Sequence, residues 1–254
     1  EDLGGGSSAF FTVETGLQPA NATASTWNNR QSFAGLKKNG VGQFAVGTQY
    51  TPTFQALAAT DVGQTNNMPG SAVYPQSAAN NAGNPGAAPF ATAGGPGNAT
   101  DSLTVRTSNT LKTPTPAAWT GAGGGTNTQD NQFYAGATYD FGILKSFLQY
   151  VSRKDTSTLN TNYFAKRSAQ QIGVRSYITP TIEGWASWGN GKVTSFGAGS
   201  PNANFVAWQA GLNYYLSKRT NLYGIYGANN LSSAAPVNPA LNTNAFALGV
   251  RHTF

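Results

Sequence analysis

Few side chains in this sequence could take part in covalent or metal chemistry. The chain has no Cys and a single His, His252, which excludes thiolate catalysis and disulfides and leaves a zinc site unsupported. A hydrolase would need a His beside a Ser or Asp inside a site, but His252 falls near the end of the last predicted strand, on its outward face. We therefore expect no enzymatic activity, no metal and no cofactor.

The charged residues favour an electrostatic role instead. There are 15 Lys and Arg against 9 Asp and Glu, a formal net charge of +6. No basic run is longer than two residues, which disfavours nucleic-acid binding because that usually needs a clustered stripe. Lys145, Arg175 and Arg251 lie on the polar faces of predicted strands. Cations scattered in this way suit a water-filled lumen that attracts anions.

The overall composition is typical of a membrane β-barrel. Only 9% of the residues are charged, against about 25% in a soluble domain. The 14 Phe, 11 Tyr and 5 Trp are too many for a disordered chain. No run of about 18 apolar residues exists, so a transmembrane helix is excluded. This balance suits strands with one lipid face, one watery face and aromatic girdles at both ends.

The C-terminal segment, residues 244–254, has the clearest strand pattern, because side chains alternate across a strand with period two. Its two faces are an apolar one with Phe246, Leu248 and Val250, and a small or charged one with Ala247, Gly249 and Arg251. A tilted transmembrane β-strand needs about 9–11 residues. The C-terminal Phe254 is typical of outer-membrane barrels, where it serves as an assembly signal. An edge strand of a soluble protein is the alternative for this segment alone.

Similar segments recur along the chain, joined alternately by short turns and by longer connections rich in Asn, Gly, Ser, Ala and Pro. For example, a strand predicted over 205–216 passes through Ser217–Arg219 into a strand over 221–228. We count about twelve strands, the weakest around 119–123, and interpret Arg153–Asp155 as an exposed loop tip. Such sorting of short turns and long loops is typical of an antiparallel transmembrane barrel.

The longest connection runs from about residue 51 to residue 98, and Asp61 is its only acidic residue. It is either a linker between two domains or a loop folded into the barrel that narrows it. We favour the loop, because the same strand pattern continues on both sides of it.

Several segments, taken together, resemble the general porins of Gram-negative outer membranes, especially those of β-proteobacteria. In order, these segments are EDLGGG (1–6) with FFTVETG (10–16), RQSFAGLKKNGVGQFAVGTQYTP (30–52), LTVRTSNTLK (103–112), ATYDFG (137–142), YYLSKRTNLYGIYG (214–227) and ALGVRHTF (247–254). No single motif is decisive, but their order and spacing are specific.

The resemblance implies a homotrimer of sixteen-stranded barrels. Residues 1–6 look like the turn after the family's second strand, so the first two strands would precede Glu1. By the same resemblance, two more strands are missing between Trp119 and Gln132. We therefore expect a single barrel domain that lacks part of its strands, with the long loop as its constriction.

The resemblance also implies which residues line that constriction. The family sets a ladder of arginines against an acidic loop, and Arg30 and Arg106 match two rungs of the ladder. Glu14 projects from the polar face of its strand and could pair with Arg30. Asp61 is the acid available in the loop, although the family's acidic signature is not recognisable between residues 51 and 98.

The sequence thus predicts an outer-membrane porin that lets small hydrophilic solutes diffuse through a water-filled channel, with a preference for anions. Its expected partners are further copies of the chain, outer-membrane lipid and lipopolysaccharide. Two alternatives remain. One is a channel specific for organic acids or sugars, and the other is a structural or adhesive barrel with a plugged lumen.

Overall fold

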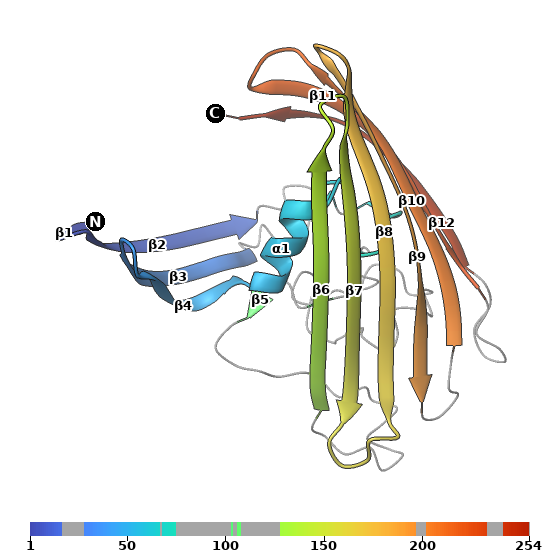
Figure 1. The fold of residues 1–254 in the computed structure, drawn as a ribbon, viewed down its shortest axis with the longest axis horizontal. Helices are drawn as coiled ribbons and strands as arrows, with labels where there is room; N and C mark the ends of the chain where they lie inside the picture. The colour runs from blue at the N-terminus through green and yellow to red at the C-terminus, as the bar shows by residue number, and fades with distance from the viewer. Residues whose placement is uncertain are drawn as a thin grey trace, which may run out of the picture. The chain divides into compact units, whose positions relative to one another are not determined.

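The structure is a computed structural model that describes residues 1–16, 28–66, 68–74, 103, 106–107, 128–196, 202–232 and 241–253. These residues form twelve strands and one helix (Figure 1). They group into two compact units, one within 1–52 and 105–112, the other within 53–104 and 113–254. No helix in the described ranges has the length and hydropathy needed to cross a membrane.

The first unit is an antiparallel sheet with the strand order β1-β2-β3-β4-β5. Its strands are β1 (Asp2–Gly4), β2 (Ser7–Gly16), β3 (Asn28–Lys38), β4 (Gly42–Tyr50) and β5 (Arg106–Thr107). The tight turn between β3 and β4 contains Gly40 with a φ of +74°, which glycine adopts without strain. Residues 1–6, which looked like a turn in the sequence, also contribute β1, whose Asp2 pairs with Ser8.

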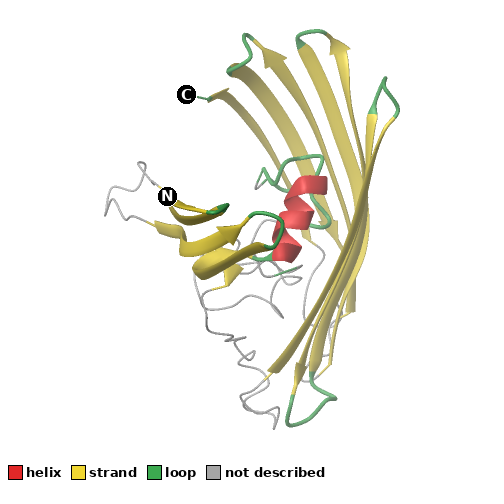
Figure 2. Cartoon of the chain, turned by 60° about the vertical axis from the view of Figure 1, so that its left-hand side comes forward, coloured by secondary structure: helices red, strands yellow, loops and turns green. Residues whose placement is uncertain are grey.

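The second unit is built on a seven-stranded antiparallel sheet in which each strand pairs with the next along the chain. Its strands are β6 (Thr128–Asp140), β7 (Lys145–Ser157), β8 (Phe164–Thr179), β9 (Ile182–Phe196), β10 (Asn202–Tyr215), β11 (Thr220–Leu231) and β12 (Leu241–His252). This sheet is curved, and the helix α1 (Pro52–Thr60) lies on its concave side (Figure 2). Short turns at 141–144, 180–181 and 216–219 join strands at one end of the sheet, which we call the turn end.

The distribution of apolar and polar side chains over the two faces of the seven-stranded sheet is the reverse of that in a soluble protein. On the outward face, away from α1, large apolar side chains such as Leu212 and Leu248 are 55% and 79% exposed. On the opposite face, which we call the polar face, Gln149, Gln171 and Gln209 are at most 2% exposed. A barrel wall between lipid and lumen needs this distribution, and it confirms the alternation predicted for residues 205–216.

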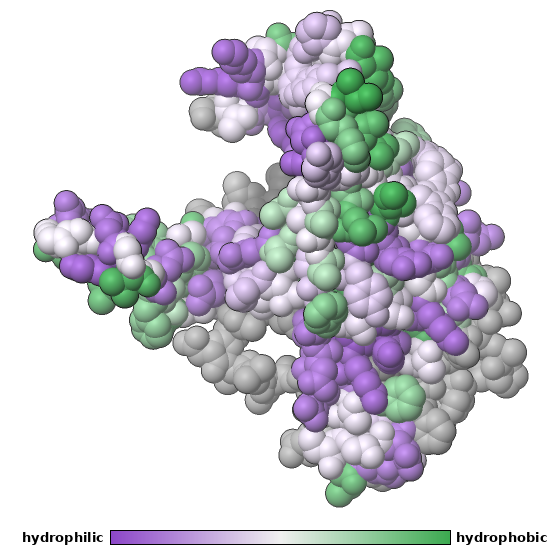
Figure 3. All heavy atoms as spheres, viewed as in Figure 1, coloured by the Kyte–Doolittle hydropathy of each residue, from purple (hydrophilic) through white to green (hydrophobic). Residues whose placement is uncertain are grey.

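Aromatic side chains gather toward both ends of the outward apolar surface. The Trp208 and Tyr226 rings lie 5.2 Å apart, toward the end opposite the turns, and the Tyr139 and Phe141 rings lie 4.6 Å apart at the turn end. Figure 3 shows hydrophobic residues concentrated toward the turn end, with hydrophilic residues more frequent toward the other end. Such girdles mark the two membrane interfaces of a barrel.

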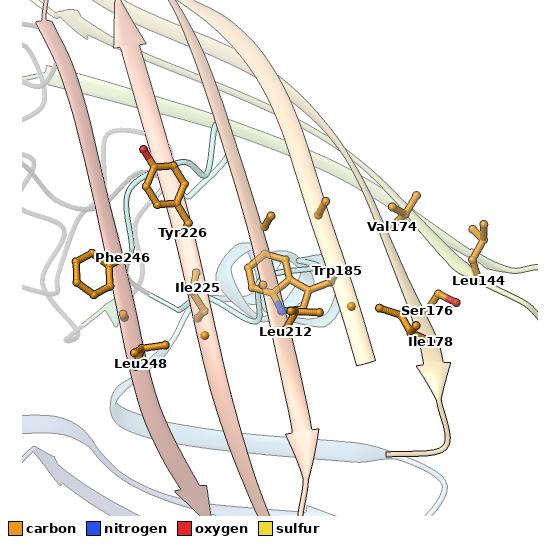
Figure 4. Close-up of a pocket in the computed structure, with 16 residues that line it drawn as sticks. Leu144, Val174, Ser176, Ile178, Trp185, Leu212, Ile225, Tyr226, Phe246 and Leu248 are labelled. Atoms are coloured by element: carbon orange, nitrogen blue, oxygen red, sulfur yellow. The ribbon is translucent and has the colours of Figure 1, made fainter. Parts of the chain in front are cut away.

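A shallow hollow of about 630 Å³ indents the outward face of β8 to β12. Figure 4 shows its side chains ranged along these strands, with Val174 at one side and Phe246 at the other. Small residues, among them Ala186 and Ala210, leave the space, and no lining side chain is charged. We therefore assign the hollow to the lipid-facing surface.

The interpretation of Arg153–Asp155 as an exposed loop tip is wrong. Strand β7 continues to Ser157, and Arg153 and Asp155 are only 2% and 3% exposed on its polar face. Two hydrogen bonds of 3.0 and 2.8 Å join the Arg153 guanidinium to Asp130 on β6. The outward apolar pattern of β7 stops at Tyr150, because the strand continues beyond the outward apolar surface and both of its faces are polar from Ser152 to Ser157.

Candidate functional site

Glu14 on β2 has polar partners on β3 and β4 of the first unit. Its carboxylate forms an ion pair with Arg30 and accepts a hydrogen bond from Gln31 Nε2 at 2.7 Å. Arg30 Nη2 also donates to Tyr50 OH at 3.0 Å. The strand register shifts between Glu14 and Thr15. This bulge leaves Arg30 as the extra residue, so the consecutive side chains of Arg30 and Gln31 both reach one carboxylate.

The two arginines that resemble rungs of a ladder lie on β3 and β5, the two strands that flank β4. Tyr50 on β4 binds the Arg30 guanidinium, and the backbone of Tyr50 pairs with that of Arg106 on β5. The side chain of Arg106 lies outside the described part of the chain. The side chains of Arg30 and Glu14 are 42% and 33% exposed, so their pair meets water and adds little to stability. An exposed pair of this kind can still set the local electric field.

In the second unit, residues 53–66 and 68–74, which we call the docked segment, lie against the polar face of the sheet. At the end of α1, Thr60 Oγ1 and Tyr134 OH on β6 are 2.5 Å apart. Beyond it, Val62 is buried against Phe147 and Trp185. The docked segment is therefore attached both by hydrogen bonds and by a small apolar contact.

Asp61 and the glutamines of the sheet form the centre of this attachment. The Asp61 carboxylate accepts hydrogen bonds from the backbone N–H of Thr65 at 2.7 Å and of Gly63 at 3.3 Å, and one from Gln171 Nε2 at 3.5 Å. Gln171 Oε1 in turn accepts from the N–H of Ala72 at 2.7 Å. Burial of the carboxyl raises the pKa of Asp61, and the hydrogen bonds from Thr65 and Gly63 oppose this shift. The loop acid predicted from the sequence is thus used to hold the loop in shape and against the sheet.

A second group of contacts fixes the segment around Pro69. Gln209 Nε2 donates to the carbonyl oxygens of Met68 at 2.9 Å and Pro69 at 2.7 Å, and the N–H of Gly70 donates to Asn229 Oδ1 at 2.8 Å. A Cβ atom on Gly227 would lie 1.8 Å from the Pro69 oxygen. Glycine is required there because the backbone of the docked segment touches the strand.

Three cations of the polar face contact the sheet, the docked segment or, in the case of Arg175, both. Arg175 contacts the Val62 carbonyl and pairs with Glu183 at 3.2 Å. Arg251 Nη1 donates to Gln64 Oε1 at 3.1 Å. Lys145 stands over the Phe147 ring, 5.5 Å from its centroid. These three cations lie on the face predicted for them, as the strand registers show.

Sequence reasoning did not find the buried glutamines or Arg167, whose Nη2 donates to the Ala72 carbonyl at 2.7 Å. Along their strands, Gln149, Gln171 and Gln209 alternate in step with the arginines of the polar face, so they point to the same side of the sheet. This alternation was the signal in the sequence that could have identified them. The predicted assembly residue Phe254 and the weak strand at 119–123 lie outside the described residues.

The described parts of the chain show no group of three or more His, Cys, Asp or Glu that could hold a metal ion. His252 Nδ1 lies 2.8 Å from Thr220 Oγ1 at the turn end of the sheet. The arrangement can therefore present charges and hydrogen bonds to a passing solute.

Comparison with known proteins agrees with this geometry. Residues 1–234 match the family described as Gram-negative porin, and the chain belongs to that family. OmpT, an outer membrane protein of Vibrio cholerae, is similar in structure, with a TM-score of 0.62 at 13% sequence identity, over 99% of this chain and 86% of that one. No curated protein matches.

Family and fold together place the protein in the outer membrane as a β-barrel of the porin class. The exposed apolar face described above is then the face toward lipid, and the polar face is the lumen wall. Since porins are channels, the family points to transport rather than to enzymatic catalysis.

Proposed function

We propose that this porin is a passive diffusion channel for small hydrophilic solutes, narrowed by its own docked segment and preferring anions. The observation that carries the proposal is the attachment of the docked segment to the polar face. Seven described side chains of the sheet, on β6, β8, β10, β11 and β12, reach this segment: Tyr134, Arg167, Gln171, Arg175, Gln209, Asn229 and Arg251. A segment held on a lumen wall reduces the open cross-section.

The anion preference is proposed to come from local charges, because the polar face as a whole is nearly neutral. Its described charged residues are five cations, Lys145, Arg153, Arg167, Arg175 and Arg251, and four acids, Asp130, Asp140, Asp155 and Glu183. Several of these are already paired with one another. A field that selects ions must therefore come from exposed cations at a narrow point, where screening is weaker than in bulk solvent.

Arg30 and Arg106 are the proposed source of that field. We expect the double substitution Arg30→Ser/Arg106→Ser to shift the zero-current potential in a KCl gradient toward cation preference. The shift should be largest at low salt, since the substitution removes two cations and leaves the Glu14 carboxylate without its arginine, and salt screens such charges. Planar-bilayer recording of single channels measures the potential and the conductance together.

A matched control is Lys218→Ser/Arg219→Ser, which removes the same charge from the turn between β10 and β11. It should leave the potential unchanged. If the control shifts the potential as much as the arginine pair does, net charge sets the selectivity instead. A protein that forms no ion-conducting channel would favour the alternative of a structural or adhesive barrel. Saturation of conductance by one solute class would favour a channel specific for organic acids or sugars.

Trimerisation is part of the proposal and rests on the family. Each copy would then form its own pore, so conductance should appear in steps of three equal levels. Cross-linking of the protein in its native membrane, followed by denaturing electrophoresis, tests the stoichiometry directly. A monomeric band alone would contradict it.

A further inference from the structure

Two phenylalanines stand side by side on the inward face of the first sheet. Phe10 on β2 and Phe33 on β3 have ring centroids 6.2 Å apart in an edge-to-face arrangement. Thr12 pairs directly with Phe33 and lies two residues along β2 from Phe10, so both rings point to one side. The other side is the face toward lipid, where Phe11 and Phe44 are 78% and 70% exposed. Since the lumen side of a porin wall is polar, two rings there need an explanation.

Packing within the sheet accounts for only one of these rings. Both side chains are half-buried, and no apolar side chain in the described part of the first unit is buried. Phe10 covers Gly35, where a Cβ atom would lie 2.6 Å from Phe10 Cζ. Aromatic cover of a strand glycine is a structural role. Phe33 has no such role, and it extends the apolar surface of Phe10 along the wall.

A polar network adjoins the two rings on the same face. Glu14 and Gln31 pair directly across their strands, two residues beyond the pair that contains Phe33. This separation is roughly 7 Å along the strand. The Arg30 guanidinium joins the network by hydrogen bonds to Glu14 and Tyr50. Aromatic and charged groups are therefore neighbours on one wall.

The guanidinium of Arg30 has donors left for an anion. Its Nε donates to Glu14 and its Nη2 to Tyr50, and its Nη1 forms no hydrogen bond with any described residue. A guanidinium carries more N–H groups than these two partners use, and the Arg30 side chain is 42% exposed. Arginine binds carboxylates through two parallel hydrogen bonds. A solute carboxylate can therefore bind Arg30 while Glu14 stays in place.

We infer that Phe10, Phe33 and Arg30 form a subsite for an aromatic carboxylate in the wall of the channel. The solute ring packs edge-to-face or offset against the two phenyl rings, and its carboxylate binds the guanidinium. A small inorganic anion would use only the arginine, and a neutral sugar lacks the charge that the arginine binds best. The inference rests on the proposed function, because it names a solute class for that channel.

The test is ligand-observed NMR of the folded protein in detergent, with benzoate as the probe. This measurement does not require a conducting channel. The variant Phe10→Leu/Phe33→Leu keeps apolar side chains but removes the aromatic faces, so it should bind benzoate about fivefold more weakly. The matched control is Phe11→Leu/Phe44→Leu, the same substitution on the lipid face, and it should bind like the wild type.

A single variant covers the case in which the inward double variant does not fold. Phe33→Leu leaves the cover of Gly35 intact and should weaken benzoate binding about twofold. Unchanged binding by the inward variants would overturn the inference, as would an equal loss in the lipid-face control.

Three further probes separate the two parts of the subsite. Acetate lacks the ring and benzyl alcohol lacks the carboxylate, so each should bind the wild type at least about tenfold more weakly than benzoate. Acetate that binds as strongly as benzoate would show a plain anion site. Equal binding of benzyl alcohol would show an apolar patch, and stronger binding of glucose would show a sugar site. Each of these three results contradicts the inference.

Planar-bilayer recording places the subsite relative to the pore. Benzoate should lower the KCl conductance of the wild type in a saturable manner, and less so in Phe10→Leu/Phe33→Leu. Benzoate binding without any effect on conductance would contradict a location in the channel wall. If benzoate binds and the channel shows no anion preference, the proposed selectivity fails and the subsite stands. If the channel prefers anions and benzoate does not bind, the subsite alone fails.

Discussion

Replacing Leu212 with arginine should destabilise the folded barrel in lipid by about 2–4 kcal/mol, the cost of a cation near the middle of the lipid-facing surface. Leu212 is 55% exposed on the outward face of β10, between the outward-facing Tyr214 and Trp208. Since that face meets hydrocarbon, the guanidinium would lose its water there. Urea titration of folding into lipid vesicles measures the change.

The next residue provides the matched control. Asn213 faces the opposite side of β10 and donates to Glu183 Oε2 at 2.8 Å. An arginine there meets water and a carboxylate, so Asn213→Arg should change stability by no more than about 1 kcal/mol. Equal losses at the two positions would contradict the assigned faces of the strand.

Replacing Gly227 with valine should displace the docked segment and raise the single-channel conductance. The new Cβ atom would lie 1.8 Å from the Pro69 oxygen, so one of the two backbones must move. Strand β11 is held by ladders to β10 and β12, whereas the segment around Pro69 is held by a few hydrogen bonds. We expect the docked segment to move, and the overpacking to lower the free energy of unfolding by about 1–3 kcal/mol.

Gly224→Val is the control on the same strand. A Cβ atom on Gly224 would meet only the flexible Leu248 side chain, at 3.1 Å, on the outward face. This variant should fold with unchanged conductance. If both valine variants conduct like the wild type, the docked segment does not narrow the pore.

The strand pattern was the part of this protein that sequence could predict best. Alternation in residues 205–216 assigned Leu212 and Gln209 to opposite faces, and their exposure agrees. The prediction failed at Arg153–Asp155, because polar residues on both faces of a strand look like a loop. Only the ladder to β6 and β8 shows that the strand continues there.

The contents of the candidate site were harder to predict. The Glu14–Arg30 pair was expected, because Glu14 projects from the polar face of its strand. The bulge that lets Gln31 also bind the Glu14 carboxylate was not expected. Gln171 is far from Ala72 in the sequence, and no local pattern links the two residues that share a hydrogen bond. In the sequence, Gly227 likewise looks like an ordinary small strand residue. Only the structure shows that the Pro69 backbone lies against it.

By itself, the sequence determined that this chain forms antiparallel strands with one apolar face and that it belongs among membrane barrels. Those properties follow from side-chain periodicity and composition, which are local and additive along the chain. Only the tertiary structure decided which polar residues hold the docked segment and where Asp61 and Arg175 direct their charges. Such contacts join residues about a hundred positions apart, and their geometry depends on strand register and backbone approach, which no local pattern encodes.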